Sequence, residues 1–128
     1  MTRRLAAVSY LVRDYDEAIE WFVDVLGFAL IEDVMIAGSK RWVLVEAPDG
    51  GARLLLAKAD GPDQDAAVGK AAGGRVAFFL HTDDFARDHA AMLAKGVTFR
   101  ETPRHETYGT VAVFADLYGN GWDLIEPR

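Results

Sequence analysis

The chain has 128 residues, of which 51% are hydrophobic and 27% are charged, a balance typical of one globular domain. Its net charge of −6 disfavours a nucleic-acid partner, because proteins that bind phosphate backbones carry basic surfaces. The absence of cysteine excludes disulfides, thiolate metal ligands and cysteine nucleophiles. No apolar segment approaches the ~20 residues of a membrane-spanning helix, so we expect no membrane partner and a cytoplasmic location.

The first half of the chain predicts a strand, a helix and three more strands. Residues 5–12 are apolar and rich in strand-forming side chains. Asp14 and Glu17 have the spacing of a capping box, and apolar residues at helical intervals follow as far as Gly27. The patterns that come next predict strands at residues 28–34, 41–46 and 53–58.

The second half repeats this order. It predicts a strand at residues 75–81, a helix capped by Asp83 or Asp84 and ended by Gly96, and three strands. These last strands are expected at residues 97–101, 110–114 and 121–126. An offset of 68 residues relates much of the first half to the second, so that Leu55 corresponds to Asp123.

These patterns predict an α+β fold made of two βαβββ modules with curved mixed sheets. We expect one domain over residues 1–128, with module one at about 1–59, an exposed linker at about 60–72 and module two at about 73–128. Two curved sheets side by side would enclose a cup, which favours ligand binding or catalysis over scaffolding.

Four segments carry a resemblance to a known family. They are residues 12–14 before the first helix, residues 21–28 at its end, residues 96–99 after the second helix, and residues 108–126. Together they resemble the vicinal-oxygen-chelate superfamily, which includes glyoxalase I, extradiol dioxygenases and the fosfomycin and bleomycin resistance proteins. The resemblance implies paired βαβββ modules, a small-molecule ligand and a homodimer.

The resemblance also implies where a metal would bind. Enzymes of this superfamily hold a divalent ion with four ligands from the first and last strands of both modules. The matching positions here are Ala7, Leu55, Arg75 and Asp123. Only Asp123 can ligate, because alanine and leucine have no donor atom and arginine is cationic. Ser9 lies near on the first strand. We therefore expect no metal or other cofactor, with a residual metal role for Asp123 left open.

Arg75 and Asp123 are the candidate catalytic or ligand-binding pair. Both are expected to point into the cup. They could form a structural ion pair, because burying either charge alone is costly. Alternatively, Arg75 could bind an anionic or carbonyl group while Asp123 orients the ligand or takes a proton.

Large rings provide further candidates for ligand contact. Trp42 and Tyr108 combine a wide apolar surface with a polar tip, and Ser9 faces the same cup. Trp122 is expected in the core, because its neighbour Asp123 points the other way. The three histidines are far apart in sequence and suggest no metal cluster.

Three hypotheses of function follow. The first is a small-molecule-binding protein of the glyoxalase/bleomycin-resistance type, with an incomplete set of metal ligands. The alternative is a superfamily enzyme (a lyase, isomerase or dioxygenase) that acts on a small organic substrate without metal or with shifted ligands. A pure interaction module is the third. The sequence leaves open whether any reaction is catalysed.

Overall fold

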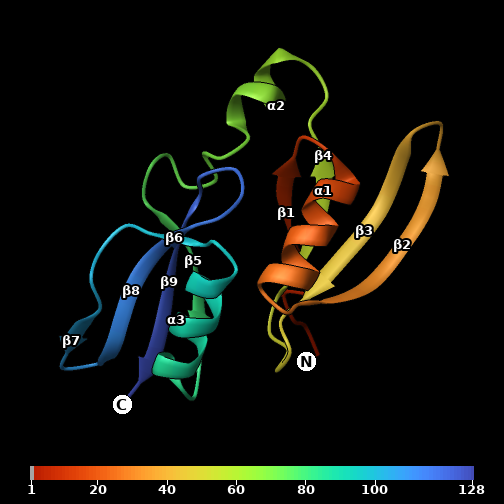
Figure 1. Cartoon of the computed structure of the whole chain (residues 1–128). Coiled ribbons are helices and arrows are strands. Elements are labelled where there is room, and N and C mark those ends of the chain that lie inside the picture. The colour runs from red at the N-terminus through yellow and green to blue at the C-terminus, as the bar shows by residue number, and fades with distance from the viewer. Residues whose placement is uncertain (1) are drawn as a thin grey trace. The chain divides into compact units, whose positions relative to one another are not determined.

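The computed structural model describes residues 2–128, which form two compact units, one ending at Val68 and the other beginning at Gly69. Each unit is a mixed β-sheet with a helix packed against one face (Figure 1). The predicted α+β class and the repeated strand–helix–strand order are confirmed.

The first unit contains four strands in the order β1-β4-β3-β2. Strand β1 runs parallel to β4, and the other neighbours are antiparallel. Its elements along the chain are β1 (Ala7–Val12), α1 (Tyr15–Glu20), the π-helical turn η1 (Trp21–Val25), β2 (Ala29–Ala37), β3 (Lys40–Glu46), β4 (Arg53–Lys58) and α2 (Pro62–Ala67).

The second unit has the strand order β5-β9-β8-β6, and β7 also pairs with β8. Its elements are β5 (Val76–His81), α3 (Phe85–Ala94), β6 (Thr98–Phe99), β7 (Arg104–Glu106), β8 (Gly109–Ala115) and β9 (Gly121–Pro127). The strand predicted at residues 97–101 is therefore only two residues long, and the sequence analysis did not anticipate β7.

Both main helices begin at an aspartate. The Asp14 carboxylate accepts a hydrogen bond from the backbone N–H of Glu17 at 2.8 Å, and Asp84 accepts one from Arg87 at 3.0 Å. These bonds satisfy N–H groups that the first turn leaves without partners. The stretch from the cap Asp14 to Gly27 is one residue longer than the stretch from the cap Asp84 to Gly96. The π-helical turn η1 takes up the extra residue.

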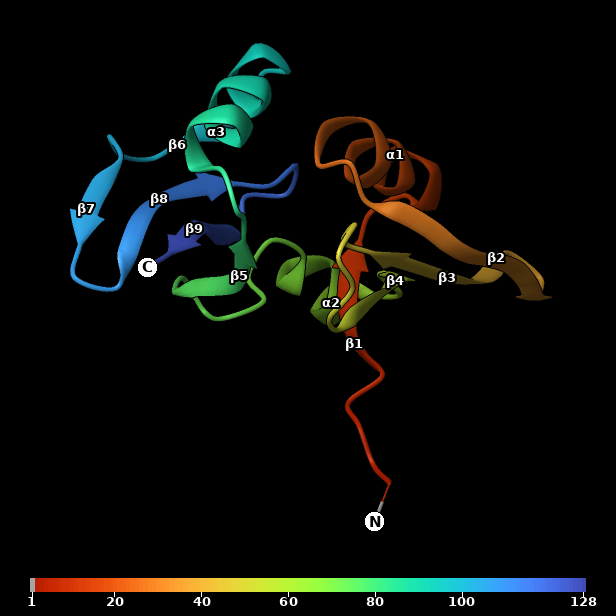
Figure 2. The ribbon, with the colours of Figure 1, turned by 90° about the horizontal axis from the view of Figure 1, so that it is seen from below.

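In the first unit, α1 covers one face of the sheet. Tyr10, Phe22 and Val43 are fully or almost fully buried beneath it, with the Tyr10 and Phe22 rings edge to face at 5.2 Å. The hairpin of β2 and β3 extends away from this helix (Figure 2). Every residue of β2 is exposed, in contrast to the buried strands beside it.

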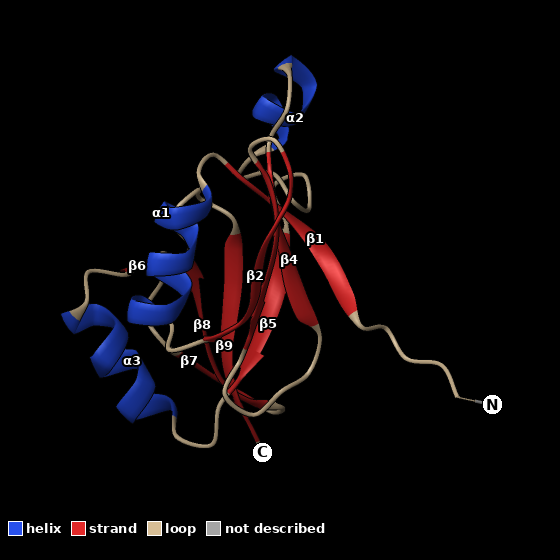
Figure 3. Cartoon of the chain, turned by 90° about the vertical axis from the view of Figure 1, so that its right-hand side faces the viewer, coloured by secondary structure: helices blue, strands red, loops and turns tan. Residues whose placement is uncertain are grey.

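In the second unit, α3 packs on one face of the sheet, as Figure 3 shows. Phe114, Trp122 and Leu124 are buried on this side, and the Phe114 and Trp122 rings stack at 5.7 Å. The prediction that Trp122 belongs to the core is confirmed. The opposite side of this sheet, called the open face below, carries no helix of its own unit.

The stretch expected as an exposed linker contains the short helix α2, whose residues are all outside the core. Proline at its first turn fits a helix start, because proline lacks the N–H that would have no partner there. Among residues 2–128, no helix has both the length and the apolar character needed to cross a membrane.

Candidate functional site

Asp123 lies in β9 and points to the open face. Its neighbours Trp122 and Leu124 are buried, and Glu126 accepts a hydrogen bond from the backbone N–H of Phe85 at the start of α3. Residues 122, 124 and 126 therefore face the helix. Because side chains alternate along a strand, Asp123 faces the other way.

The strands on either side place apolar groups next to this carboxyl. Phe79 of β5 pairs with Asp123 on one side, and Val113 of β8 pairs with it on the other. The Phe79 side chain is 63% exposed, so its ring is accessible beside the acid. The open face thus combines one carboxyl group with an apolar surface.

The Asp123 carboxyl is only partly satisfied. Within residues 2–128, its Oδ1 is buried and has no hydrogen-bond partner. Burial raises the pKa of Asp123 above that of an ordinary aspartate, the nearby Arg104 charge counteracts this in part, and the Glu101 charge adds to it. The group therefore holds its proton more strongly than an exposed aspartate does.

Arg104 organises the charges around Asp123. Its Nε donates to Glu101 Oε1 at 2.7 Å, its Nη2 donates to Glu101 Oε2 at 3.2 Å, and its Nη1 donates to Glu106 Oε1 at 2.9 Å. A side-chain hydrogen bond with Tyr108 also raises the pKa of Arg104. One guanidinium therefore connects two glutamates and a tyrosine.

Glu101 has the opposite protonation tendency to Asp123. The hydrogen bonds from Arg104 lower the pKa of Glu101, and so does a hydrogen bond from the backbone N–H of Val113. Two neighbouring carboxyl groups with pKa values moved in opposite directions can act as one proton donor and one fixed negative charge.

The predicted pairing of Arg75 with Asp123 is wrong. Arg75 precedes β5, and the residue of β5 that pairs with Asp123 is Phe79, four positions further along the chain. Arg75 is exposed, and the charges that act on Asp123 come from Arg104 and Glu101. The arginine whose charge lowers the pKa of Asp123 is thus Arg104 and not Arg75.

The predicted residues Ser9 and Trp42 belong to the first unit. Ser9 is exposed and pairs with Leu55, whereas Ala7 pairs with Arg53. We expected Ala7 to lie opposite Leu55, since both match metal positions of the superfamily, and this expectation is wrong. Trp42 is 40% exposed. Because Ser9 and Trp42 belong to the first unit and Asp123 and Tyr108 to the second, their place in a shared site stays a prediction.

Comparison with known proteins is consistent with the repeated architecture. A family model described as "Glyoxalase/Bleomycin resistance protein/Dioxygenase superfamily" matches residues 4–124. The chain belongs to this superfamily.

Relatives in the superfamily cover nearly the whole chain. An uncharacterised protein of Shewanella frigidimarina is 49% identical, across 98% of this chain and 95% of its own length. The crystal structure of UcmS2 is similar with a TM-score of 0.82 and 28% identity, covering 98% of this chain and 99% of that one. TnmS3, an antibiotic binding protein from Streptomyces, gives a TM-score of 0.77 and 25% identity over 99% and 98%.

The side chains at the superfamily's metal positions do not fit a divalent ion. They provide one carboxylate, Asp123, together with the hydrocarbon side chains of Ala7 and Leu55 and the cation Arg75. Phe79, the residue that pairs with Asp123 in the sheet, offers no donor atom either. In the described part of the chain, no three His, Asp or Glu side chains are grouped so that they could hold a metal. A stable divalent site needs more ligands than one.

Glu101, Arg104 and Glu106 were not among the site residues predicted from the sequence. The spacing of Arg104 and Glu106 could have indicated an ion pair, because residues two apart lie on the same face of a strand. The segment was expected to lie outside strands, since the predicted strand stopped at residue 101 and β7 has only three residues.

Proposed function

We propose that this superfamily member binds a small organic molecule on the open face of its second unit, with Asp123 as the polar anchor. The observation that supports this most directly is the buried Oδ1 of Asp123, which lacks a hydrogen-bond partner among residues 2–128. Leaving such an atom without a partner costs about 1–3 kcal/mol. A ligand that donates an N–H or O–H group to Asp123 would recover this energy.

The surroundings of Asp123 favour a ligand with a flat apolar body. The exposed ring of Phe79 and the side chain of Val113 flank the carboxyl on the open face. Aromatic side chains cover apolar ligands well, and one or two polar groups then fix the orientation. We therefore expect an aromatic or heteroaromatic compound that carries an amine, amide or hydroxyl group.

The comparisons support the binding of a small molecule. TnmS3 is described as an antibiotic binding protein, and it shares the fold over almost the full length of both chains. The single carboxylate at the metal positions is consistent with a protein that holds its ligand through hydrogen bonds and apolar contact. Sequestration of a small molecule fits these features.

The test is a screen of small aromatic amines, amides and phenols by native mass spectrometry and thermal shift. Compounds that bind are then titrated against Asp123→Asn and Asp123→Ala. We expect binding to weaken about tenfold or more when the carboxylate is replaced by alanine, since a charge-assisted hydrogen bond contributes about 1.5–3 kcal/mol. The matched control is Asp65→Asn, which changes an exposed carboxylate of α2.

If Asp123→Ala and Asp65→Asn bind the same compound as tightly as the unchanged protein, the ligand does not use Asp123. Binding that is lost instead in variants of the first unit, such as Trp42→Ala, would move the site away from the open face. Either result contradicts the proposal.

A second candidate function is metal-free proton-transfer catalysis. It is favoured by the opposite pKa shifts of Asp123 and Glu101, which Arg104 helps to maintain. A partly buried carboxyl with a raised pKa can serve as a general acid, provided that it lies within hydrogen-bond reach of the reacting group. Mass analysis of each bound compound after incubation separates the two functions, because an enzyme converts the compound and Asp123→Asn stops the conversion.

We also propose that the protein forms a homodimer through the edge strand β2. The side chains of Val34, Met35 and Ile36 are 53–63% exposed on this nine-residue strand, which is an unusual amount of apolar surface for a sheet edge. Light scattering during size-exclusion chromatography should give twice the chain mass, and Met35→Glu should shift the protein to the monomer. A monomeric unchanged protein would contradict this assembly.

A further inference from the structure

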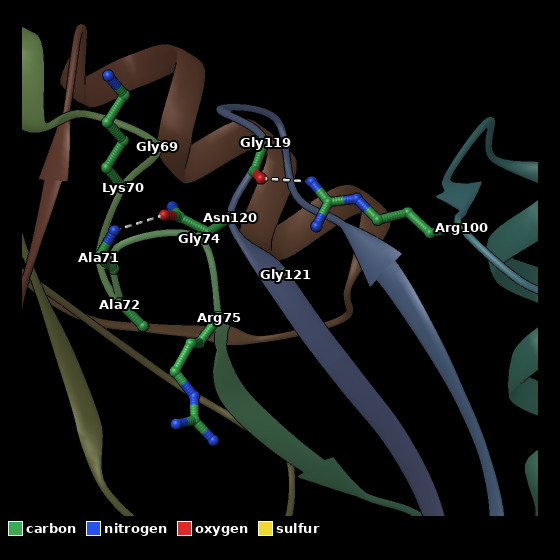
Figure 4. A pocket seen from close by; sticks show the side chains of 10 residues that line it. All are labelled: Gly69, Lys70, Ala71, Ala72, Gly74, Arg75, Arg100, Gly119, Asn120 and Gly121. Carbon is green, nitrogen blue, oxygen red and sulfur yellow. Dashed lines mark hydrogen bonds between the residues drawn. The ribbon is translucent and has the colours of Figure 1, made fainter.

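A basic pocket lies in the second unit at the start of β9. Its volume is about 150 Å3, which is room for several water molecules or a small oxyanion. Figure 4 shows the side chains that line it. They come from the loop before β5, the segment between β6 and β7, and the turn before β9: Gly69, Lys70, Ala71, Ala72, Gly74, Arg75, Arg100, Gly119, Asn120 and Gly121.

The charge of this pocket contrasts with the rest of the chain. Three of the lining residues, Lys70, Arg75 and Arg100, are cationic and none is acidic, although the whole protein has a net charge of −6. Within residues 2–128, none of the three forms an ion pair. By contrast, Arg87 and Arg104 of the second unit each contact two carboxylates.

The wall of the pocket is fixed by hydrogen bonds that do not use these cations. Asn120 accepts a bond from the backbone N–H of Ala71 at 3.0 Å, which joins the loop before β5 to the turn before β9. Asp116 in turn accepts bonds from the backbone and side chain of Asn120, at 3.0 and 3.1 Å. Both Asp116 and Asn120 are buried, so the two loops are held together by a satisfied network.

Arg100 crosses this wall next to Gly121. Its Nη2 donates to the carbonyl oxygen of Gly119 at 2.6 Å. A Cβ at Gly121 would lie 3.0 Å from Arg100 Nη1, so the absence of a side chain there lets the guanidinium lie against the strand. Arg100 uses one N–H on this carbonyl and retains donors for another acceptor.

Lys70 and Arg75 complete the pocket from the other loop. Both side chains are exposed, and Figure 4 shows the guanidinium of Arg75 pointing away from that of Arg100. Since no carboxylate holds either one, both can turn toward an anion that enters between the loops. Arginine suits this role because its planar fork binds phosphate through two parallel hydrogen bonds.

We propose that this pocket binds a phosphate group, either as inorganic phosphate or as the phosphate of a small organic molecule. The excess of three positive charges favours an ion that carries close to two negative charges over a single carboxylate. The glycines of the lining leave the backbone accessible to an anion, as in other concave phosphate sites. The pocket is separate in its residues from the carboxyl-containing site around Asp123.

The test uses two-dimensional amide NMR spectra of the full chain during titration with sodium phosphate, at constant ionic strength set with sodium chloride. We expect saturable shifts at Gly69, Gly74, Gly119 and Gly121. Arg75→Gln and Lys70→Gln should each weaken phosphate binding by up to about fivefold, the range of an exposed charge pair. The double variant should weaken it by roughly 25-fold if the effects add.

The matched control is Arg3→Gln, which removes the same charge from an exposed position in the first unit. Thermal unfolding of every variant checks that the fold is retained. Phenyl phosphate then distinguishes an organic phosphate ligand from inorganic phosphate. If phenyl phosphate binds more tightly than inorganic phosphate, the ligand is organic, and if the two bind equally, it is the free ion. Both results support a phosphate site.

Three outcomes overturn the proposal. The first is a titration in which phosphate and chloride produce the same unsaturable shifts. The second is sodium acetate that binds as tightly as phosphate, which would show a general cationic surface. The third is phosphate binding that disappears in Asp123→Asn but remains in Arg75→Gln, which would place the anion at the open face. The first two leave the proposed function at Asp123 intact.

Discussion

Glu101 accepts a hydrogen bond from the backbone N–H of Val113 at 2.9 Å, and Val113 is the β8 residue that pairs with Asp123. The two carboxyl groups are thus tied to the same point of the sheet. Their pKa values move in opposite directions, because Glu101 is ion-paired, whereas Asp123 is partly buried and its Oδ1 has no hydrogen-bond partner among residues 2–128. As the pH falls, Asp123 should therefore bind its proton earlier than an exposed aspartate does, and Glu101 later than an exposed glutamate does.

Replacing Asp123 by asparagine should stabilise the protein at neutral pH. Burial raises the pKa of Asp123, so the folded state holds its proton over a pH range in which the unfolded chain has released it. Stability then falls as the pH rises from the ordinary aspartate pKa through the raised one. We expect Asp123→Asn to gain up to about 1 kcal/mol above this range and little below it. Urea unfolding over a pH series measures the difference.

The matched control for this series is Asp65→Asn, which should show no comparable trend. A stability difference between Asp123→Asn and the unchanged protein that is constant across the pH series would show that the Asp123 carboxyl titrates like one in the unfolded chain.

The variant Glu101→Gln should show the reverse dependence. The hydrogen bonds from Arg104 and Val113 lower the pKa of Glu101, so the stabilisation is present above the ordinary glutamate pKa and is lost as the pH falls through the lowered one. We expect a loss of about 1 kcal/mol at neutral pH that shrinks in acid. NMR titration should also find a lower pKa for Asp123 in this variant, because the Glu101 charge helps to raise it. An unchanged Asp123 titration curve would contradict the coupling.

In the first unit, Tyr15→Phe tests how the β2–β3 hairpin is anchored to α1. The Tyr15 hydroxyl oxygen accepts a hydrogen bond from the backbone N–H of Arg41 at 3.1 Å, and the Arg41 guanidinium lies 5.0 Å from the Tyr15 ring centre. Loss of the acceptor should cost about 1 kcal/mol in urea unfolding, with the ring contact retained. Asp16→Asn is the comparison, since this partner of Arg41 is 80% exposed and its loss should change little. Equal effects of the two substitutions would contradict a specific role for the hydroxyl.

Gly69→Ala should destabilise the second unit more than an ordinary glycine substitution. Gly69 has φ +82°, and a Cβ there would collide with the backbone carbonyl oxygen of Tyr118. Backbone strain and overpacking together should cost about 3 kcal/mol. Gly27→Ala is the control, because its φ of +73° brings the strain but no atom lies within 4 Å of the added Cβ. Similar unfolding free energies for the two variants would show that the loop before β5 shifts to make room.

Local signals in the sequence predict most of the fold. The caps at Asp14 and Asp84 and the glycines that end both helices depend on hydrogen bonds a few residues apart, which a sequence displays directly. Alternation along the last strand likewise places Trp122 in the core and Asp123 on the other face. These predictions needed no knowledge of how the strands pair.

Strand register could not be predicted by counting residues. An offset of 68 relates Leu55 to Asp123, but the two helix caps differ by 70. A single offset therefore assigned Arg75 as the counterpart of Ala7, where the cap spacing indicates Ala77. An error of two residues preserves the face of a strand but moves a side chain about 7 Å along it. Arg75 lies four positions before Phe79, the residue that pairs with Asp123, so about 13 Å along the strand separates the predicted pair.

The charged residues around Asp123 could not be predicted from the sequence for a different reason. Arg104 acts through β7, which pairs with β8 at three positions and gives no clear strand pattern of its own. Glu101 bonds to Val113, twelve residues away, through its side chain. Contacts of this kind depend on how a loop folds back onto a sheet, which is tertiary structure rather than local propensity.

The π-helical turn at Trp21–Val25 has a consequence for how the first unit can vary. The first helix has one residue more than α3, and its π-helical turn accommodates this residue within the hydrogen-bond pattern of the helix. The strands on both sides therefore keep their pairing. The same turn could release that residue and become a regular α-helix, with Asp14 and Gly27 still at its two ends. Changes of chain length that would disrupt a sheet elsewhere can therefore accumulate here, and relatives of this protein are free to differ in length at this point while retaining the same strand register.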